Sequence, residues 1–161
     1  MTGQGTILVL GLGNSLLSDD GFGIHVINAL GTQMTDDLGI RCLDGGTLGL
    51  SLLPDIEDAE ALILVDAAEV GAAAGALRLF EGAAMDAQLG GKKRTVHEVA
   101  AFDLMSAAAL TGHHPRNRAL LAVQPQSTDW GLEPTQPVMA AIPEACAMVE
   151  RLARKWRGAR S

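Results

Sequence analysis

Two neighbouring aspartates, Asp19 and Asp20, follow a glycine-rich turn directly after the first apolar run of the chain. That run, Thr6–Leu10, is short, rich in β-branched residues and ended by glycines, which predicts the first strand of a parallel sheet buried on both faces. A carboxylate at such a turn serves a functional site or caps the helix expected to begin near Gly21. The segment by itself favours neither role over the other.

Two further side chains could join Asp20 at the same edge of the sheet. Asp66 ends the apolar run Ala61–Val65, and His97 precedes a helix expected to begin at Glu98. Ligands bind at the carboxyl ends of strands in open α/β sheets. Two carboxylates and one imidazole suit Zn, Ni or Mn and leave a position open for substrate.

Each of these residues also has a structural interpretation. Asp66 could satisfy backbone N–H groups at the end of its strand, and His97 could be a loop residue beside the basic cluster at 92–94. Their spacing along the chain does not decide between the two interpretations.

The glycine turn at residues 11–14 (GLGN) also allows a second function class. A strand, a GxG turn and a helix are typical of a dinucleotide site, in which the helix N-terminus binds phosphate. Here the third fingerprint position is Leu16 instead of glycine, and the two acids would repel a phosphate. A nucleotide-binding or small-molecule-binding α/β module therefore remains the alternative to a metal site.

Common hydrolytic motifs are absent from the sequence: it has no GxSxG, no HExxH, and no DTG or DSG. Hydrolysis by this chain would therefore use a metal and water in place of a side-chain nucleophile.

Composition narrows the class of protein and its partners. The chain has 161 residues, 48% of them hydrophobic, which suits one domain with one core. Aromatic residues make up 3% and the net charge is −7, so nucleic acid is not expected as a partner. No apolar run approaches the roughly 20 residues that span a bilayer, and no basic leader precedes one, so we expect a cytoplasmic protein without membrane contact.

Strands and helices are expected to alternate over a single domain at residues 1–161, with a short basic tail at about 157–161. This alternation predicts a doubly wound α/β fold. The expected strands are Thr6–Leu10, Ile40–Leu43, Ala61–Asp66, Gly75–Phe80 and Leu120–Val123. The expected helices are Phe22–Met34, Glu98–Leu110, in which Val99, Phe102, Met105 or Ser106, and Ala109 recur at helical spacing, and a last helix within Pro137–Trp156. Pro143 either kinks this last helix or marks its first turn.

Five motifs resemble, in order and spacing, those of the hydrogenase maturation endopeptidases. They are GLGNSLLSDDGFG (11–23), LDGGTLG (43–49), LILVDA (62–67), the segment around His97, and the element from Gln124 to Thr135. The resemblance covers about residues 6–142. It implies a twisted, mostly parallel five-stranded sheet with helices on both faces. It also implies a hydrolase, a protease that matures a nickel–iron hydrogenase by trimming a C-terminal peptide from the large subunit.

The same resemblance assigns the site residues. The nickel-recognition ligands of the family match Asp20, Asp66 and His97, which are also the implied catalytic residues. Many members have Glu at the position of Asp20. The implied partner is the nickel-containing precursor of the large subunit, which supplies the nickel, so no permanently bound cofactor is expected. The metal could polarise the scissile carbonyl or lower the pKa of a water, with one carboxylate accepting the proton.

Overall fold

Five strands form one sheet in the order β2-β1-β3-β5-β4 in the computed structural model, which describes residues 5–33, 38–46, 50–91 and 95–158. Four strands are parallel, and β4 runs antiparallel to β5 at one edge. The strands are β1 (Ile7–Gly11), β2 (Ile40–Asp44), β3 (Ala61–Ala67), β4 (Leu77–Glu81) and β5 (Asn117–Val123). The predicted mostly parallel five-stranded α/β fold is confirmed, with strand boundaries that differ from the predicted ones by at most three residues.

Burial explains which strands lie in the middle of the sheet. Every residue of β1 and β3 is buried, as expected for unbroken apolar runs that are covered on both faces. The edge strands β2 and β4 contain only exposed and partly buried residues. The carboxyl ends of β1 and β3 therefore lie in the interior of the sheet, where polar side chains can be sheltered.

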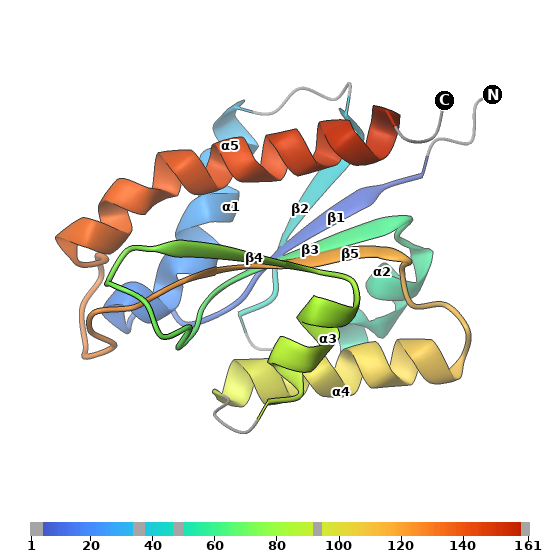
Figure 1. Ribbon diagram of the computed structural model, residues 1–161, viewed down its shortest axis with the longest axis horizontal. Helices are drawn as coiled ribbons and strands as arrows, with labels where there is room; N and C mark the ends of the chain where they lie inside the picture. The colour runs from blue at the N-terminus through green and yellow to red at the C-terminus, as the bar shows by residue number, and fades with distance from the viewer. Residues whose placement is uncertain (1–4, 34–37, 47–49, 92–94, 159–161) are drawn as a thin grey trace.

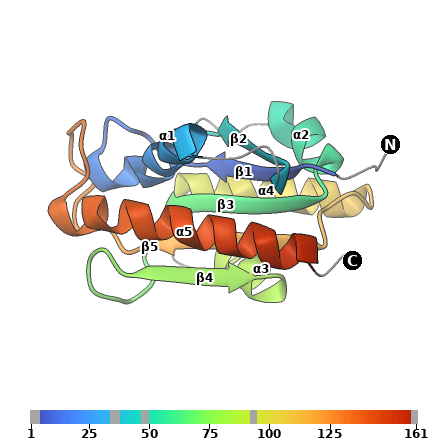
Figure 2. The same ribbon diagram turned by 90° about the horizontal axis from the view of Figure 1, so that it is seen from above.

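Helices cover both faces of the sheet (Figure 1). On one face lie α1 (Phe22–Gln33) and α5 (Gln136–Gly158), and Figure 2 shows α5 lying over β5. On the other face lie α2 (Leu53–Asp58), α3 (Ala83–Leu89) and α4 (Val96–Leu110). Each layer has its own apolar core, so alternate residues of a central strand belong to different cores. No helix in the described part of the chain is long and apolar enough to cross a membrane.

The apolar spacing predicted for α4 does not identify its buried face, apart from Met105. The buried apolar residues of this helix are Ala101, Leu104, Met105 and Ala108, while Val99 and Phe102 lie on its exposed side. Apolar residues occur on every side of this helix, so their spacing does not identify the face that packs on the sheet. A helix was expected after the second strand with Thr47 as its cap; α2 follows that strand but begins at Leu53, and Thr47 lies outside the described residues. The short helix α3 was not expected from the sequence.

The C-terminal helix also differs from its prediction. It begins at Gln136, so Pro143 lies in its interior and does not mark its first turn. Arg157, expected in the basic tail, lies in the last turn of the helix and donates hydrogen bonds to Leu38 O at 2.9 Å and Glu60 Oε1 at 3.0 Å. The rest of the predicted tail (159–161), Met34 and the basic cluster at 92–94 lie outside the described residues.

Candidate active site

The turn after β1 brings Asp20 back toward the strand that it follows. Gly13 has a φ of +112°, and a Cβ there would meet Asp20 O at 1.8 Å, so only glycine allows this approach. The chain then forms a short 3-10 helix, η1 (Ser18–Gly21). Asn14 N–H donates to Asp20 Oδ2 at 3.0 Å, which closes the turn and orients the carboxylate.

Asp66 lies in β3 on the face that α4 covers, because it alternates with Leu62 and Leu64 of that core. Its side chain is 0% exposed. Asp66 Oδ1 accepts the Ala67 N–H at 2.8 Å, whereas Oδ2 is buried without a hydrogen-bond partner. Burial raises the pKa of Asp66 well above its ordinary value. The site therefore contains one carboxylate oxygen that has no hydrogen-bond partner among the described residues.

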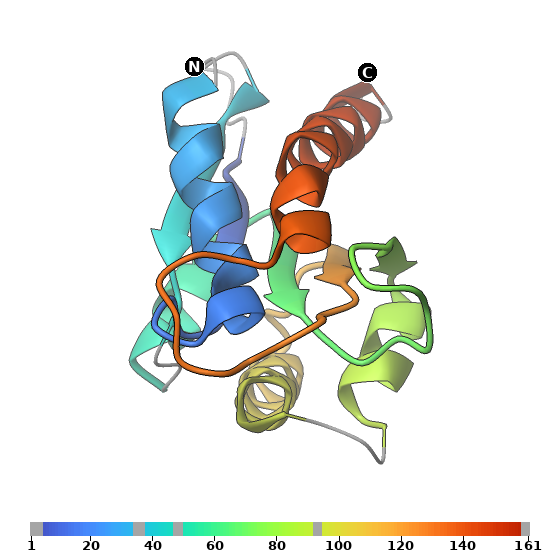
Figure 3. The same ribbon diagram turned by 90° about the vertical axis from the view of Figure 1, so that its left-hand side faces the viewer.

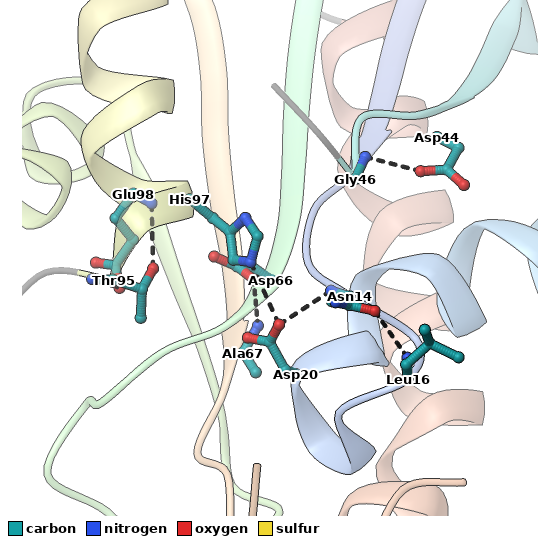
Figure 4. A network of polar contacts seen from close by, with 10 residues as sticks. All are labelled: Asn14, Leu16, Asp20, Asp44, Gly46, Asp66, Ala67, Thr95, His97 and Glu98. Carbon is teal, nitrogen blue, oxygen red and sulfur yellow. Dashed lines mark hydrogen bonds and ion pairs between the residues drawn. The ribbon is translucent and has the colours of Figure 1, made fainter. Parts of the chain in front are cut away.

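His97 is placed by a capping box at the start of α4. Thr95 Oγ1 accepts the Glu98 N–H at 3.1 Å, and Glu98 Oε1 accepts the Thr95 N–H at 3.3 Å. The helix consequently begins two residues earlier than the sequence predicts, and His97 lies in its first turn instead of the preceding loop. This position directs the imidazole at the carboxyl ends of the central strands (Figure 4).

His97 and Asp20 form an ion pair when the imidazole is protonated, with His97 Nε2 3.3 Å from Asp20 Oδ2. The hydrogen bond to Asp20 raises the pKa of His97, and the nearby Asp66 carboxylate acts in the same direction. Burial raises the pKa of Asp20, but the hydrogen bonds from His97 and the Asn14 N–H outweigh it and lower the pKa overall. Within the described residues, the Asp20 carboxylate is bonded to these two groups and not to the first N–H groups of α1.

The pair has the right separation for two ligands of one ion. Donors bound to the same tetrahedral metal at about 2.0–2.1 Å lie roughly 3.3–3.4 Å apart, and His97 Nε2 and Asp20 Oδ2 are 3.3 Å apart. In the described part of the chain, no three His, Cys, Asp or Glu side chains stand ready to hold a metal ion by themselves. The residues thus provide a partial donor set that fits an ion bringing ligands of its own.

An open polar cleft of about 320 Å³ adjoins these residues. Its walls come from the turn after β1, the start of α1, the end of β2 and the start of α4. They include Gly13, Asn14, Ser15, Ile24, Asp44, Gly46 and His97. Gly46 N–H donates to Asp44 Oδ1 at 2.7 Å and fixes the rim on that side. An extended segment of another chain can therefore reach the imidazole from outside.

Asp19 has a role that the sequence did not indicate. Its carboxylate is 0% exposed and accepts the N–H groups of Gln126 at 2.7 Å, Ser127 at 3.0 Å and Thr135 at 2.6 Å. Thr135 Oγ1 also donates to it. Burial raises the pKa of Asp19, but these hydrogen bonds outweigh it and the pKa is lowered. The partners follow more than a hundred residues later, so no local pattern could have predicted them.

The glycine turn is poorly suited to a phosphate. Leu12 N–H donates to Val65 O at 2.9 Å, Asn14 N–H to Asp20 Oδ2 at 3.0 Å, and Leu16 N–H to Asn14 Oδ1 at 2.9 Å. A phosphate site needs free backbone N–H groups, and these donors are already used in hydrogen bonds within the turn or to β3.

Comparisons with known proteins agree with the geometry. A model of the family "Hydrogenase maturation protease" matches residues 24–152. HupD, a hydrogenase expression/formation protein of Rhizobium leguminosarum bv. viciae, is 36% identical over 93% of this chain and 72% of its own length. The hydrogenase 2 maturation protease of Escherichia coli K12 is 35% identical over 83% of this chain and 82% of its own.

A solved structure extends the likeness to the whole fold. The hydrogenase maturating endopeptidase HybD of Escherichia coli superposes with a TM-score of 0.86 at 33% identity, covering 93% of both chains. The resemblance found in the sequence is confirmed: this chain belongs to the hydrogenase maturation protease family of endopeptidases.

Proposed function

We propose that this chain removes a C-terminal peptide from the nickel-loaded precursor of a nickel–iron hydrogenase large subunit and recognises the nickel through Asp20, Asp66 and His97. The observation that carries the proposal is the pairing of His97 Nε2 with Asp20 Oδ2 at 3.3 Å beside an Asp66 oxygen that has no partner. The family supports the wider part of it, because its members are proteases that act in hydrogenase maturation.

An incomplete ligand set makes the enzyme selective for loaded substrate. Two carboxylates and one imidazole bind a borderline ion weakly, and thiolates of the precursor would supply the remaining ligands. Nickel therefore arrives as cargo of the substrate, and no cofactor belongs to the resting enzyme. A precursor without nickel offers nothing for these three residues to bind.

The same residues suit the hydrolytic step. Nickel beside the scissile bond polarises its carbonyl or acidifies a water. The Asp66 carboxylate keeps one buried oxygen without a partner among the described residues, and this oxygen can accept the proton of that water. The open cleft beside His97 has room for the extended peptide on either side of the cut. A cytoplasmic location fits this role and stays a prediction.

The nucleotide-binding alternative has less support. It needs the backbone N–H groups of the turn after β1, and Asn14 and Leu16 already donate theirs within the turn. Only a competing ligand that broke both hydrogen bonds could bind there.

Cleavage assays on single variants test the three assignments. We expect His97→Ala and Asp20→Asn to lower kcat/KM by roughly a thousandfold or more, as loss of a group that acts in the transition state does. Asp20→Glu should retain activity because it keeps the carboxylate. The assay follows the mass of nickel-loaded precursor, and the matched control is His113→Ala, an exposed histidine in the turn after α4. Cleavage by folded His97→Ala at the wild-type rate would contradict the assignment.

A further inference from the structure

The loop that joins β5 to α5 is not used by the proposed chemistry, although it lies directly beside the site loop. We refer to residues 125–134 of this loop as the strap. Figure 3 shows the strap crossing over the segment that contains η1, and Figure 1 shows the same two segments together. The strap thus covers the outside of the loop that presents Asp20.

The strap is fastened at several points. Asp19 accepts N–H groups of Gln126 and Ser127 near one end of the strap and of Thr135 just beyond the other. Between these points, Ser18 N–H donates to Gly131 O at 2.9 Å, and Gly131 N–H donates to Leu16 O at 2.9 Å. A segment held by this many hydrogen bonds presents its side chains in a fixed arrangement.

The fastened strap exposes large apolar side chains. Trp130 is 80% exposed and Leu132 is 72% exposed, on either side of Gly131, and Leu16 beside them is 47% exposed. We call these three residues the strap patch. The protein has only 2 tryptophans and no tyrosine, and one of the two tryptophans is the exposed Trp130. Exposed apolar clusters on an ordered backbone mark contact sites for another protein.

The strap patch is continuous with the cleft. Asn14 and Ser15 line the cleft beside His97, and the next residue, Leu16, belongs to the patch. Leu16 O accepts the N–H of Gly131, the residue between Trp130 and Leu132, so the strap adjoins the segment that leads out of the cleft. The occupant most directly indicated is the protein whose peptide lies in the cleft.

We infer that the strap patch is the docking surface for the folded body of the hydrogenase large-subunit precursor, which presents an apolar patch beside its C-terminal segment. This inference rests on the proposed function. Contacts at Trp130 and Leu132 bind the precursor, while the cleft receives the segment to be cut. Docking is therefore separate from nickel recognition, and changes at the strap affect binding of the precursor more than the rate of the bound complex.

Kinetics and binding of a double variant test the inference. Trp130→Ser with Leu132→Ser should raise KM for nickel-loaded precursor from the same organism by roughly tenfold or more, as loss of central interface residues does, with kcat unchanged. The control is Leu110→Ser, which removes an equally exposed side chain, 89% exposed at the far end of α4, and should leave KM unchanged. Urea unfolding should show equal stability for all three proteins.

Binding to immobilised wild-type protein is measured separately, so that docking is tested apart from cleavage. If wild type binds precursor and the double variant does not, docking at the strap holds even where no cleavage occurs, and the proposed function alone fails. If wild type cleaves and the double variant matches it in KM and binding, the docking inference is wrong and the proposed function stands. Sedimentation showing that the double variant only loses self-association would assign the patch to a second copy of this chain and overturn the inference.

Discussion

Asp19 and Asp66 are both fully buried carboxylates, yet the protein treats them in opposite ways. Asp19 accepts three backbone N–H groups and a hydroxyl, and its pKa is lowered. Asp66 accepts one N–H group, keeps one oxygen without a partner, and has a raised pKa. Buried polar groups are normally satisfied, so a saturated carboxylate indicates a structural role and an unsatisfied one indicates a functional site.

Asp20 connects the hydrogen-bonded surroundings of Asp19 to the site that contains Asp66 and His97. It directly follows Asp19 in η1, so the hydrogen bonds that fix Asp19 also fix the backbone that carries Asp20. The Asp20 carboxylate itself is left to face His97. Asp19 thereby holds the backbone of η1 in place, and Asp20 contacts His97.

The largest effect on stability is expected for Asp19→Asn. The amide keeps one acceptor oxygen and directs its NH₂ at N–H donors, so at least one buried donor loses its partner. We expect a loss of about 3 kcal/mol in the free energy of unfolding, since an unsatisfied buried donor costs roughly 1–3 kcal/mol and bonds to charged groups are stronger. Urea unfolding at pH 7 measures this loss.

Asp20→Asn is the matched control, because the same change one residue away should cost under about 1 kcal/mol, as expected for a partly exposed ion pair. The lowered pKa of Asp19 means that its contribution is present above its unfolded value near 3.9 and is lost as pH falls through the folded value. The deficit of Asp19→Asn should therefore shrink below about pH 4. If Asp19→Asn and Asp20→Asn lost equal amounts of unfolding free energy at pH 7, the structural role assigned to Asp19 would be wrong.

A smaller effect of opposite sign is expected for Asp66→Asn. Replacing an unsatisfied buried carboxylate by a neutral amide should raise the free energy of unfolding at pH 7 by about 1 kcal/mol, while precursor cleavage is lost. The raised pKa of Asp66 means that the wild type is most stable relative to the variant below pH 4 and loses this advantage as pH rises toward the folded value. Unfolding at pH 4 and pH 7 checks the sign, with Asp103→Asn on the exposed side of α4 as control. A clear loss of stability at pH 7 would make Asp66 a structural residue.

Much of the fold could be predicted because its central strands are unbroken apolar runs. The runs at residues 6–10, 61–66 and 120–123 correspond to β1, β3 and β5. The packed face of α4 could not be predicted, since that helix is apolar on all sides and only the sheet beneath it selects Leu104 over Phe102. The short helices α2 and α3 lack a long periodic pattern.

The residues of the candidate site also differ in how well the sequence predicts them. Asp20, Asp66 and His97 could be chosen because each adjoins an apolar run or a helix start. The position of His97 within α4 does have a signal in the sequence, the Thr95-x-x-Glu98 capping box. Asp19 had no such signal, because its partners become its neighbours only when the strap folds back over η1.

Varying the metal content of the precursor tests whether the enzyme recognises nickel carried by its substrate. Enzyme treated with chelator and then freed of it is incubated with nickel-loaded and with nickel-free precursor, and the mass of each product is measured. We expect the metal-free enzyme to shorten the nickel-loaded precursor and to leave the nickel-free one intact. Cleavage of both precursors alike, or cleavage only after the enzyme has taken up a tightly bound metal of its own, would contradict this expectation.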